Sequence, residues 1–165
     1  MSARIRMATS AQDIEEARDL MRAYARWTGI DLCLQNFEEE LAELPGKYSA
    51  SNGALWLAHT EQTAIPVGVV AVRPLAALED ESGSACEPKR LRVAPQAKGT
   101  GPGRALAETA ITFARSADYA EIRLDTLRTR MPAAIALYRS LGFVAAEPYT
   151  HNPEPDVLYM ILKLS

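Results

Sequence analysis

A glycine-rich segment near the middle of the chain, residues 93–103, constrains the fold more than any other part of the sequence. Residues 86–93 before it have the pattern of a strand, and residues 103–116 after it have the apolar spacing of a helix. Glycines let a backbone approach a ligand closely, and the N-terminus of a helix adds N–H donors and a partial positive charge. The segment therefore predicts a strand, an anion-binding turn and a helix. Its glycines are Gly99, Gly101 and Gly103.

The charges around this turn favour a phosphate or pyrophosphate as the anion. Lys98 and Arg104 add full positive charges to the backbone donors. Two nucleotide motifs do not fit: no GxxxxGK[ST] is present, and the third glycine of GxGxxG would fall on Arg104. The alternative is a plain strand-to-helix turn in which the glycines serve only the geometry.

A second informative segment, residues 134–143, has the spacing of an amphipathic helix that Gly142 ends. Tyr138 lies on the apolar face of this helix, so it is either a core residue or an acid. A tyrosine is a useful acid only if its hydroxyl points at a reacting group.

Composition excludes several classes of protein. The 165 residues carry 18 Lys+Arg and 21 Asp+Glu, a net charge of −3, and 48% of them are apolar. This balance disfavours disorder, and no stretch approaches the roughly 20 apolar residues of a membrane-spanning helix. The mild acidity argues against nucleic acid as a partner. We expect one domain over residues 1–165 with no membrane segment.

The hydrophobic pattern along the chain predicts a mixed α/β fold. The expected strands are residues 4–8, 54–58, 65–72, 86–93, 121–126, 143–145 and 157–164. The expected helices are one capped within residues 9–13 that runs to 27, then 37–44, 103–116 and 132–141.

The cysteines and the N-terminus indicate the compartment. Cys33 and Cys86 are far apart, with no CxxC and no histidine at metal-ligand spacing, so we expect free thiols and no metal site. The first residues lack the apolar core of a signal peptide, and a cytoplasmic location follows by default.

The two segments together resemble the GNAT superfamily of acyl-CoA-dependent N-acetyltransferases. The family pattern Q/R-x-x-G-x-G/A falls on residues 98–103, with Lys98 in place of Gln or Arg, and Pro102 removes one N–H from the turn. Residues 136–143, ALYRSLGF, match the family's tyrosine-bearing helix. The resemblance implies a mixed, mostly antiparallel sheet of about six or seven strands flanked by about four helices.

The resemblance also implies acetyl-CoA as cofactor. The glycine-rich turn would bind its pyrophosphate, and the end of the preceding strand would pair with its pantetheine arm and polarise the acetyl carbonyl. The implied cofactor-binding residues are Leu91, Arg92, Val93, Lys98, Gly99, Thr100, Gly101, Gly103 and Arg104.

Acetyl transfer to an amine also needs a base and an acid. The resemblance makes Tyr138 the acid that protonates the leaving thiolate, while Met131 stands where the family often has Asn. Glu87 is our first choice of base, and its alternative role is a solvated strand charge or a salt bridge to Lys89 or Arg90. Asp125 is the second choice, or else a structural carboxylate.

The acceptor is expected to be a small-molecule amine or a protein amine, taken up by direct transfer in a ternary complex. A non-catalytic acyl-CoA-binding or sensor module on the same fold is the alternative function. Many family members pair through their C-terminal strands, so a homodimer is one state that the resemblance allows. Candidate substrate-binding residues are Asp31, Cys33, Gln35 and Asp125, with Trp27 and Tyr149 nearby in the expected acceptor loops.

Overall fold

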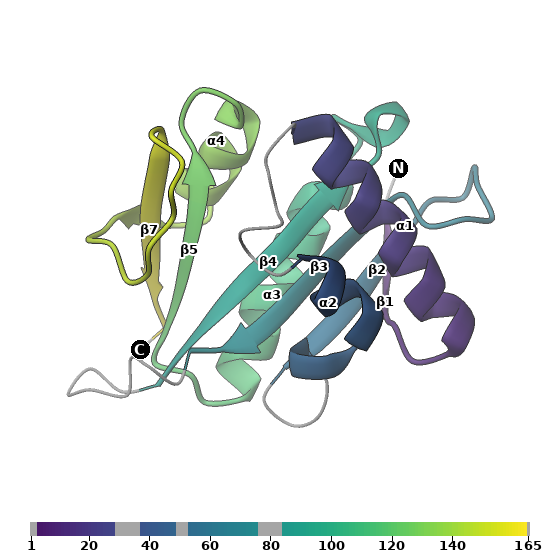
Figure 1. The fold of residues 1–165 in the computed structure, drawn as a ribbon, viewed down its shortest axis with the longest axis horizontal. Coiled ribbons are helices and arrows are strands. Elements are labelled where there is room, and N and C mark those ends of the chain that lie inside the picture. Colours follow the sequence, from purple (N-terminus) through teal and green to yellow (C-terminus); the bar gives the residue numbers. More distant parts are fainter. Residues whose placement is uncertain (1–2, 29–36, 49–52, 76–83, 165) are drawn as a thin grey trace. The chain divides into compact units, whose positions relative to one another are not determined.

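The computed structural model describes residues 3–28, 37–48, 53–75 and 84–164 (Figure 1). Its strands are β1 (Arg4–Met7), β2 (Ala54–His59), β3 (Gly68–Pro74), β4 (Ala85–Val93), β5 (Glu121–Leu127), β6 (Val144–Ala145) and β7 (Val157–Lys163). The α-helices of the described residues are α1 (Ala11–Thr28), α2 (Phe37–Glu43), α3 (Pro102–Ser116) and α4 (Pro132–Ser140), and short 3-10 turns cover Gly46–Tyr48 and Pro95–Ala97.

Hydrogen bonds join the seven strands into one sheet in the order β1-β2-β3-β4-β5-β7-β6. The β1–β2, β2–β3, β5–β7 and β6–β7 pairs are antiparallel, whereas β4 and β5 are parallel. A mixed, mostly antiparallel sheet with four helices confirms the expected fold class.

One strand begins later than the sequence suggests. The pattern predicts a strand from Ile65, but β3 begins at Gly68, which pairs with Ala58 of β2. Pro66 has no N–H to donate to the ladder, and Ile65 lies in the preceding turn with 63% of its surface exposed. β2 and β3 are consecutive, antiparallel strands and form a hairpin.

The chain forms two compact units, and β4 and α3 contribute residues to both. The first unit is Met1–Arg73 with Lys89–Ala110, and the second is Pro74–Pro88 with Ile111–Ser165.

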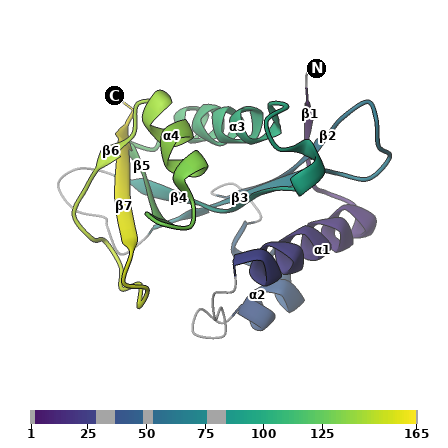
Figure 2. The same cartoon turned by 90° about the horizontal axis from the view of Figure 1, so that it is seen from above.

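In the first unit, α1 and α2 cover one face of β2 and β3 (Figure 2). The alternate residues of the two strands that point toward these helices are fully buried: Leu55, Leu57, Val69 and Ala71. The opposite face meets α3 at Gly68. A Cβ atom at Gly68 would lie 2.9 Å from Leu106 Cδ1 and 3.0 Å from the Arg92 carbonyl oxygen, so only glycine fits there.

The second unit is built on the β5–β7 ladder, in which Leu124 pairs with Met160 and Asp125 with Tyr159. Successive residues of a strand point to opposite faces, so the two pairs lie on different sides of the ladder. Leu124 and Met160 are almost fully buried. Asp125 and Tyr159 lie on the face that carries the polar side chains described below.

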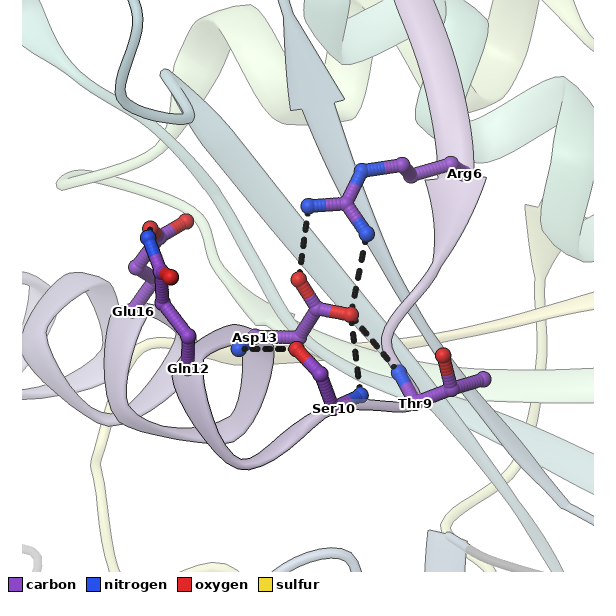
Figure 3. Close-up of polar contacts among 6 residues, drawn as sticks. All are labelled: Arg6, Thr9, Ser10, Gln12, Asp13 and Glu16. Atoms are coloured by element: carbon purple, nitrogen blue, oxygen red, sulfur yellow. Dashed lines mark hydrogen bonds and ion pairs between the residues drawn. The ribbon is translucent and has the colours of Figure 1, made fainter.

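A reciprocal cap starts α1, and Figure 3 shows its contacts. Asp13 Oδ2 accepts hydrogen bonds from the N–H groups of Thr9 (2.9 Å) and Ser10 (3.0 Å), while Ser10 Oγ accepts one from the Asp13 N–H (3.0 Å). Arg6 of β1 donates to both carboxylate oxygens, at 2.6 and 2.9 Å. The Arg6 guanidinium and the two backbone donors hold the pKa of Asp13 well below its usual range. The predicted N-cap within residues 9–13 is confirmed.

Asp13→Asn is expected to lower the free energy of unfolding by about 1–3 kcal/mol at pH 7, because it removes a charged cap and leaves Arg6 without its carboxylate. The folded-state pKa of Asp13 is depressed, so its contribution is present above the ordinary Asp pKa of about 3.9 and is lost as pH falls below that value. Urea unfolding measured from pH 3 to 7 therefore gives a difference between wild type and variant that shrinks with acidity. Asp19→Asn, at an exposed position of the same helix, is the control, with a change within about 0.5 kcal/mol. Equal stability of Asp13→Asn and wild type at pH 7 would contradict the prediction.

Candidate functional site

The glycine-rich turn lies entirely in the first unit, between the end of β4 and the start of α3. Thr100 Oγ1 donates to the Ala97 carbonyl oxygen at 2.6 Å, which closes the turn on the preceding 3-10 turn. Gly99 and Gly101 have φ values of 79° and 108°, a region that side-chain-bearing residues rarely adopt. The backbone conformation at these two positions therefore favours glycine, and the chain reverses there before the helix.

The turn presents backbone donors and charge to solvent. Ala105 N–H donates to the Gly101 carbonyl oxygen at 3.1 Å, so α3 begins directly after Gly101, and the first N–H groups of a helix have no acceptor within it. Lys98 and Arg104 are exposed, and Arg104 Nη1 lies 3.5 Å from Glu108 Oε1. Apart from Gly99 and its two chain neighbours, no heavy atom of the described residues lies within 4 Å of a Cβ placed on Gly99, which leaves space beside the backbone. The turn has the donors, charge and space that a phosphate group needs.

The basic residues of β4 do not form an exposed cluster. Arg90 is buried and pairs with Glu40 of α2, with 3.0 Å between Nε and Oε2, and its guanidinium carbon lies 5.0 Å from the centroid of the Phe37 ring. Arg90 also has a φ of 62°, unusual for a residue with a side chain. Three of the four residues 89–92 are basic, which suggests a solvated face that could attract an anion, but Arg90 and Arg92 are buried and do not form one.

The sequence contained a signal for the Glu40–Arg90 pair that we did not use. Glu40 lies three residues after Phe37 and one before Leu41, on the buried side of α2. A carboxylate on an apolar helix face needs a partner, because burying an unpaired charge is costly. The identity of that partner, 50 positions away, could not be obtained from helical spacing.

Three of the implied cofactor contacts, Leu91, Arg92 and Val93, form the end of β4. Leu91 and Val93 are partly buried, and Arg92 is buried with its guanidinium donating to the Val93 carbonyl oxygen. Burial lowers the pKa of the Arg92 guanidinium, and the nearby Tyr24 phenol opposes this shift. The Arg92 side chain is thus part of the first unit's interior.

In the second unit, the hydroxyl of Tyr149 donates a hydrogen bond to Glu87 Oε2. Glu87 of β4 has no exposed surface, while Tyr149, in the segment between β6 and β7, is partly exposed. Glu87 is therefore not a solvated strand charge. The predicted base and the acceptor-loop tyrosine are 62 positions apart, so no local pattern in the sequence relates them.

Asp125 of β5 anchors the same segment. Its Oδ2 accepts a hydrogen bond from Asn152 Nδ2 at 3.1 Å, and Asn152 Oδ1 accepts one from the Glu154 N–H at 3.0 Å, as in an Asx turn. This contact supplies the structural role that we considered as the alternative for Asp125. A substrate-binding role for Asp125 stays a prediction.

Tyr138 of α4 lies in the core of the second unit, with 9% of its surface exposed. Its ring centroid lies 5.5 Å from that of Phe143, with an interplanar angle of 58°. Met131, where the family often has Asn, accepts a 3.7 Å contact at its sulfur from Thr126 Oγ1. The packing fixes the Tyr138 ring and is compatible with either role considered for it.

Three expected acceptor residues, Asp31, Cys33 and Gln35, and the Trp27 side chain lie outside the described residues. Cys86 is a free, buried thiol, and burial raises its pKa to about 12. Among the residues that the structure describes, no group of three or more His, Cys, Asp or Glu could hold a metal ion. Within the same residues, no helix combines the length and apolarity needed to cross a bilayer.

Comparison with known proteins gives a consistent set of relatives. The family model for the acetyltransferase (GNAT) domain matches residues 51–145. A Schizosaccharomyces pombe protein named as an uncharacterized N-acetyltransferase is 38% identical over 154 residues, which cover 93% of this chain and 90% of the relative.

Two solved structures share the fold. A GNAT-family acetyltransferase from Staphylococcus aureus has a TM-score of 0.78 at 18% identity, covering 99% of this chain and 100% of its own. The PaiA N-acetyltransferase of Thermoplasma acidophilum, solved in complex with coenzyme A, has a TM-score of 0.73 at 19% identity, covering 99% and 100%. The chain belongs to the GNAT acetyltransferase family, which supports acyl transfer as its class of activity.

Glu40→Gln is expected to lower the free energy of unfolding by about 3 kcal/mol, because it removes the carboxylate charge that faces the buried Arg90. Urea unfolding at pH 7 measures the effect. Glu39→Gln, on the exposed side of the same helix, is the matched control and should change stability by less than about 0.5 kcal/mol. Equal losses of unfolding free energy in the two variants would contradict a stabilising role for the Glu40–Arg90 pair.

Proposed function

We propose that the chain is an acetyl-CoA-dependent N-acetyltransferase that moves the acetyl group directly to a primary amine in a ternary complex. One observation carries the proposal. In a chain of the GNAT family, a turn with two positive-φ glycines leads directly into the N-terminus of α3. Such a turn is suited to a pyrophosphate, which is the anionic part of coenzyme A.

The fit of coenzyme A to this turn is supported by the residues present. The N–H groups at Gly101 and Gly103 and the charges of Lys98 and Arg104 would hold the pyrophosphate, while Thr100 keeps the turn closed. When bound, acetyl-CoA supplies an activated acetyl thioester. The backbone of residues 91–93 would hold the acetyl carbonyl by its N–H groups.

Two side chains of the second unit are proposed for the proton transfers. Glu87 is the base for the acceptor ammonium, and Tyr138 returns a proton to the leaving thiolate. Cys86, next to Glu87, stays a protonated thiol at neutral pH because burial raises its pKa to about 12. A protonated thiol is a poor nucleophile, which supports direct transfer over an acetyl-cysteine intermediate at Cys86.

The remaining parts of the proposal rest on the sequence and on family membership together. We infer one N-acetyltransferase domain over residues 1–165, located in the cytoplasm and capable of forming a homodimer. The acceptor would be a small-molecule amine or a protein amine, bound with the help of Asp31, Cys33, Gln35 and Asp125. An assay of thiol release from acetyl-CoA across a panel of amines tests the activity. Binding of acetyl-CoA without turnover on any amine would favour the non-catalytic binding module instead.

Gly101→Ala is expected to weaken acetyl-CoA binding about tenfold, because alanine at a φ of 108° strains the turn and moves its N–H donors. Isothermal titration calorimetry measures the dissociation constant. Gly46→Ala, at a φ of 40° outside the turn, controls for backbone strain. It should lower stability and leave the dissociation constant within about twofold of wild type. A dissociation constant for Gly101→Ala equal to that of wild type would contradict the role of the turn.

Tyr138→Phe is expected to lower kcat about a hundredfold, because the variant keeps the packed ring and loses only the hydroxyl that protonates the thiolate. The dissociation constant for acetyl-CoA should change by less than about threefold, which calorimetry measures beside the turnover assay. A variant with unchanged kcat would make Tyr138 a packing residue alone.

A further inference from the structure

The Glu87–Tyr149 contact carries an inference that deepens the proposed function and depends on it. Glu87 has no exposed surface, so an acceptor amine has no direct access to its carboxylate. The hydroxyl of Tyr149 donates to Glu87 Oε2, and Tyr149 itself is partly exposed. A base that is buried behind a hydrogen-bonded hydroxyl exchanges protons through that hydroxyl.

We propose that Tyr149 carries the proton of the acceptor ammonium to Glu87, as the substrate-facing member of a tyrosine–carboxylate dyad. One N–H bond of the ammonium breaks and its proton binds Tyr149 Oη. At the same time the original Oη–H bond breaks and that proton binds Glu87 Oε2. The nitrogen keeps its lone pair for attack on the acetyl carbonyl. The dyad is left with a neutral tyrosine and a protonated Glu87, and no oxidation or reduction takes place.

The segment that carries Tyr149 is held in position for this transfer. The Tyr149 ring meets the Tyr159 ring edge-on, with centroids 5.5 Å apart and an interplanar angle of 81°. Tyr159 donates its hydroxyl to the Thr150 carbonyl oxygen at 2.8 Å, and its own carbonyl oxygen accepts the Ala146 N–H at 2.8 Å. Hydrogen bonds on both sides of Tyr149 therefore hold the backbone, and the ring contact orients the phenol.

These anchors also separate a catalytic role for Tyr149 from a structural one. None of them uses the Tyr149 hydroxyl. Tyr149→Phe keeps the aromatic ring against Tyr159 and leaves the contacts of Thr150 and Ala146 intact, while it removes the hydroxyl that donates to Glu87. A merely structural tyrosine would lose stability on this change, with no change in the pH dependence of the reaction.

The test compares Tyr149→Phe with wild type on an amine from the panel. The variant is expected to lose about a hundredfold in kcat/KM at pH 7, with the dissociation constant for acetyl-CoA within about twofold. Its rate should keep rising with pH through the titration of the acceptor ammonium, because only amine that is already deprotonated reacts. The wild-type rate should reach its plateau at lower pH.

Two further variants make the outcome decisive. Glu87→Gln should show the same pH dependence as Tyr149→Phe, and the double variant should be no slower than either single variant, since the two residues act as one unit. Tyr119→Phe, which removes the hydroxyl of another partly buried tyrosine of the second unit, is the control and should stay within about twofold of wild type.

The possible failures are distinguishable. A wild-type protein that acetylates no amine overturns the proposed function and the dyad with it. An active wild type, combined with a Tyr149→Phe variant of unchanged rate and pH profile, overturns the dyad alone. Additive effects of the two single variants would also overturn it.

Discussion

The parallel pairing of β4 with β5 is the constraint on which the other features of the molecule depend. The pair forms between Ala85 and Glu121 and between Cys86 and Ile122. Parallel strands cannot be joined by a tight hairpin, so the chain that leaves β4 has to cross over before β5 begins. The glycine-rich turn and α3 form this crossover. The same requirement that fixes the topology therefore places the N-terminus of a helix just beyond the end of β4, where its donors can serve a ligand.

Local signals explain how much of the fold could be predicted from the sequence. The glycines of the turn, the cap at Ser10 and Asp13 and the glycine after α4 act within a few residues, and each predicted its element. The predicted start of β3 was wrong. The apolar Ile65 suggested that the strand begins there, but Pro66 has no N–H for strand pairing. Apolar character alone does not report whether a backbone N–H is available.

The candidate site was less predictable, because its decisive contacts join distant positions. Glu87 and Tyr149 are 62 residues apart, and Glu40 and Arg90 are 50 apart. No periodicity relates such pairs. The basic residues of β4 and of the turn that follows it lie in two environments. Arg90 is buried and pairs with the Glu40 carboxylate, whereas Lys98 is exposed.

The two edge strands of the sheet, β1 and β6, disfavour pairing with a strand from another molecule for different reasons. β1, at one end, has only four residues, and Arg4 and Arg6 on it are exposed. A strand from another molecule that added to β1 would bring its backbone beside these guanidinium groups, which disfavours growth of the sheet. β6, at the other end, has two residues and offers too short a template for stable pairing despite its exposed Val144. The two edges of the sheet therefore leave little backbone to which a strand from another molecule could add.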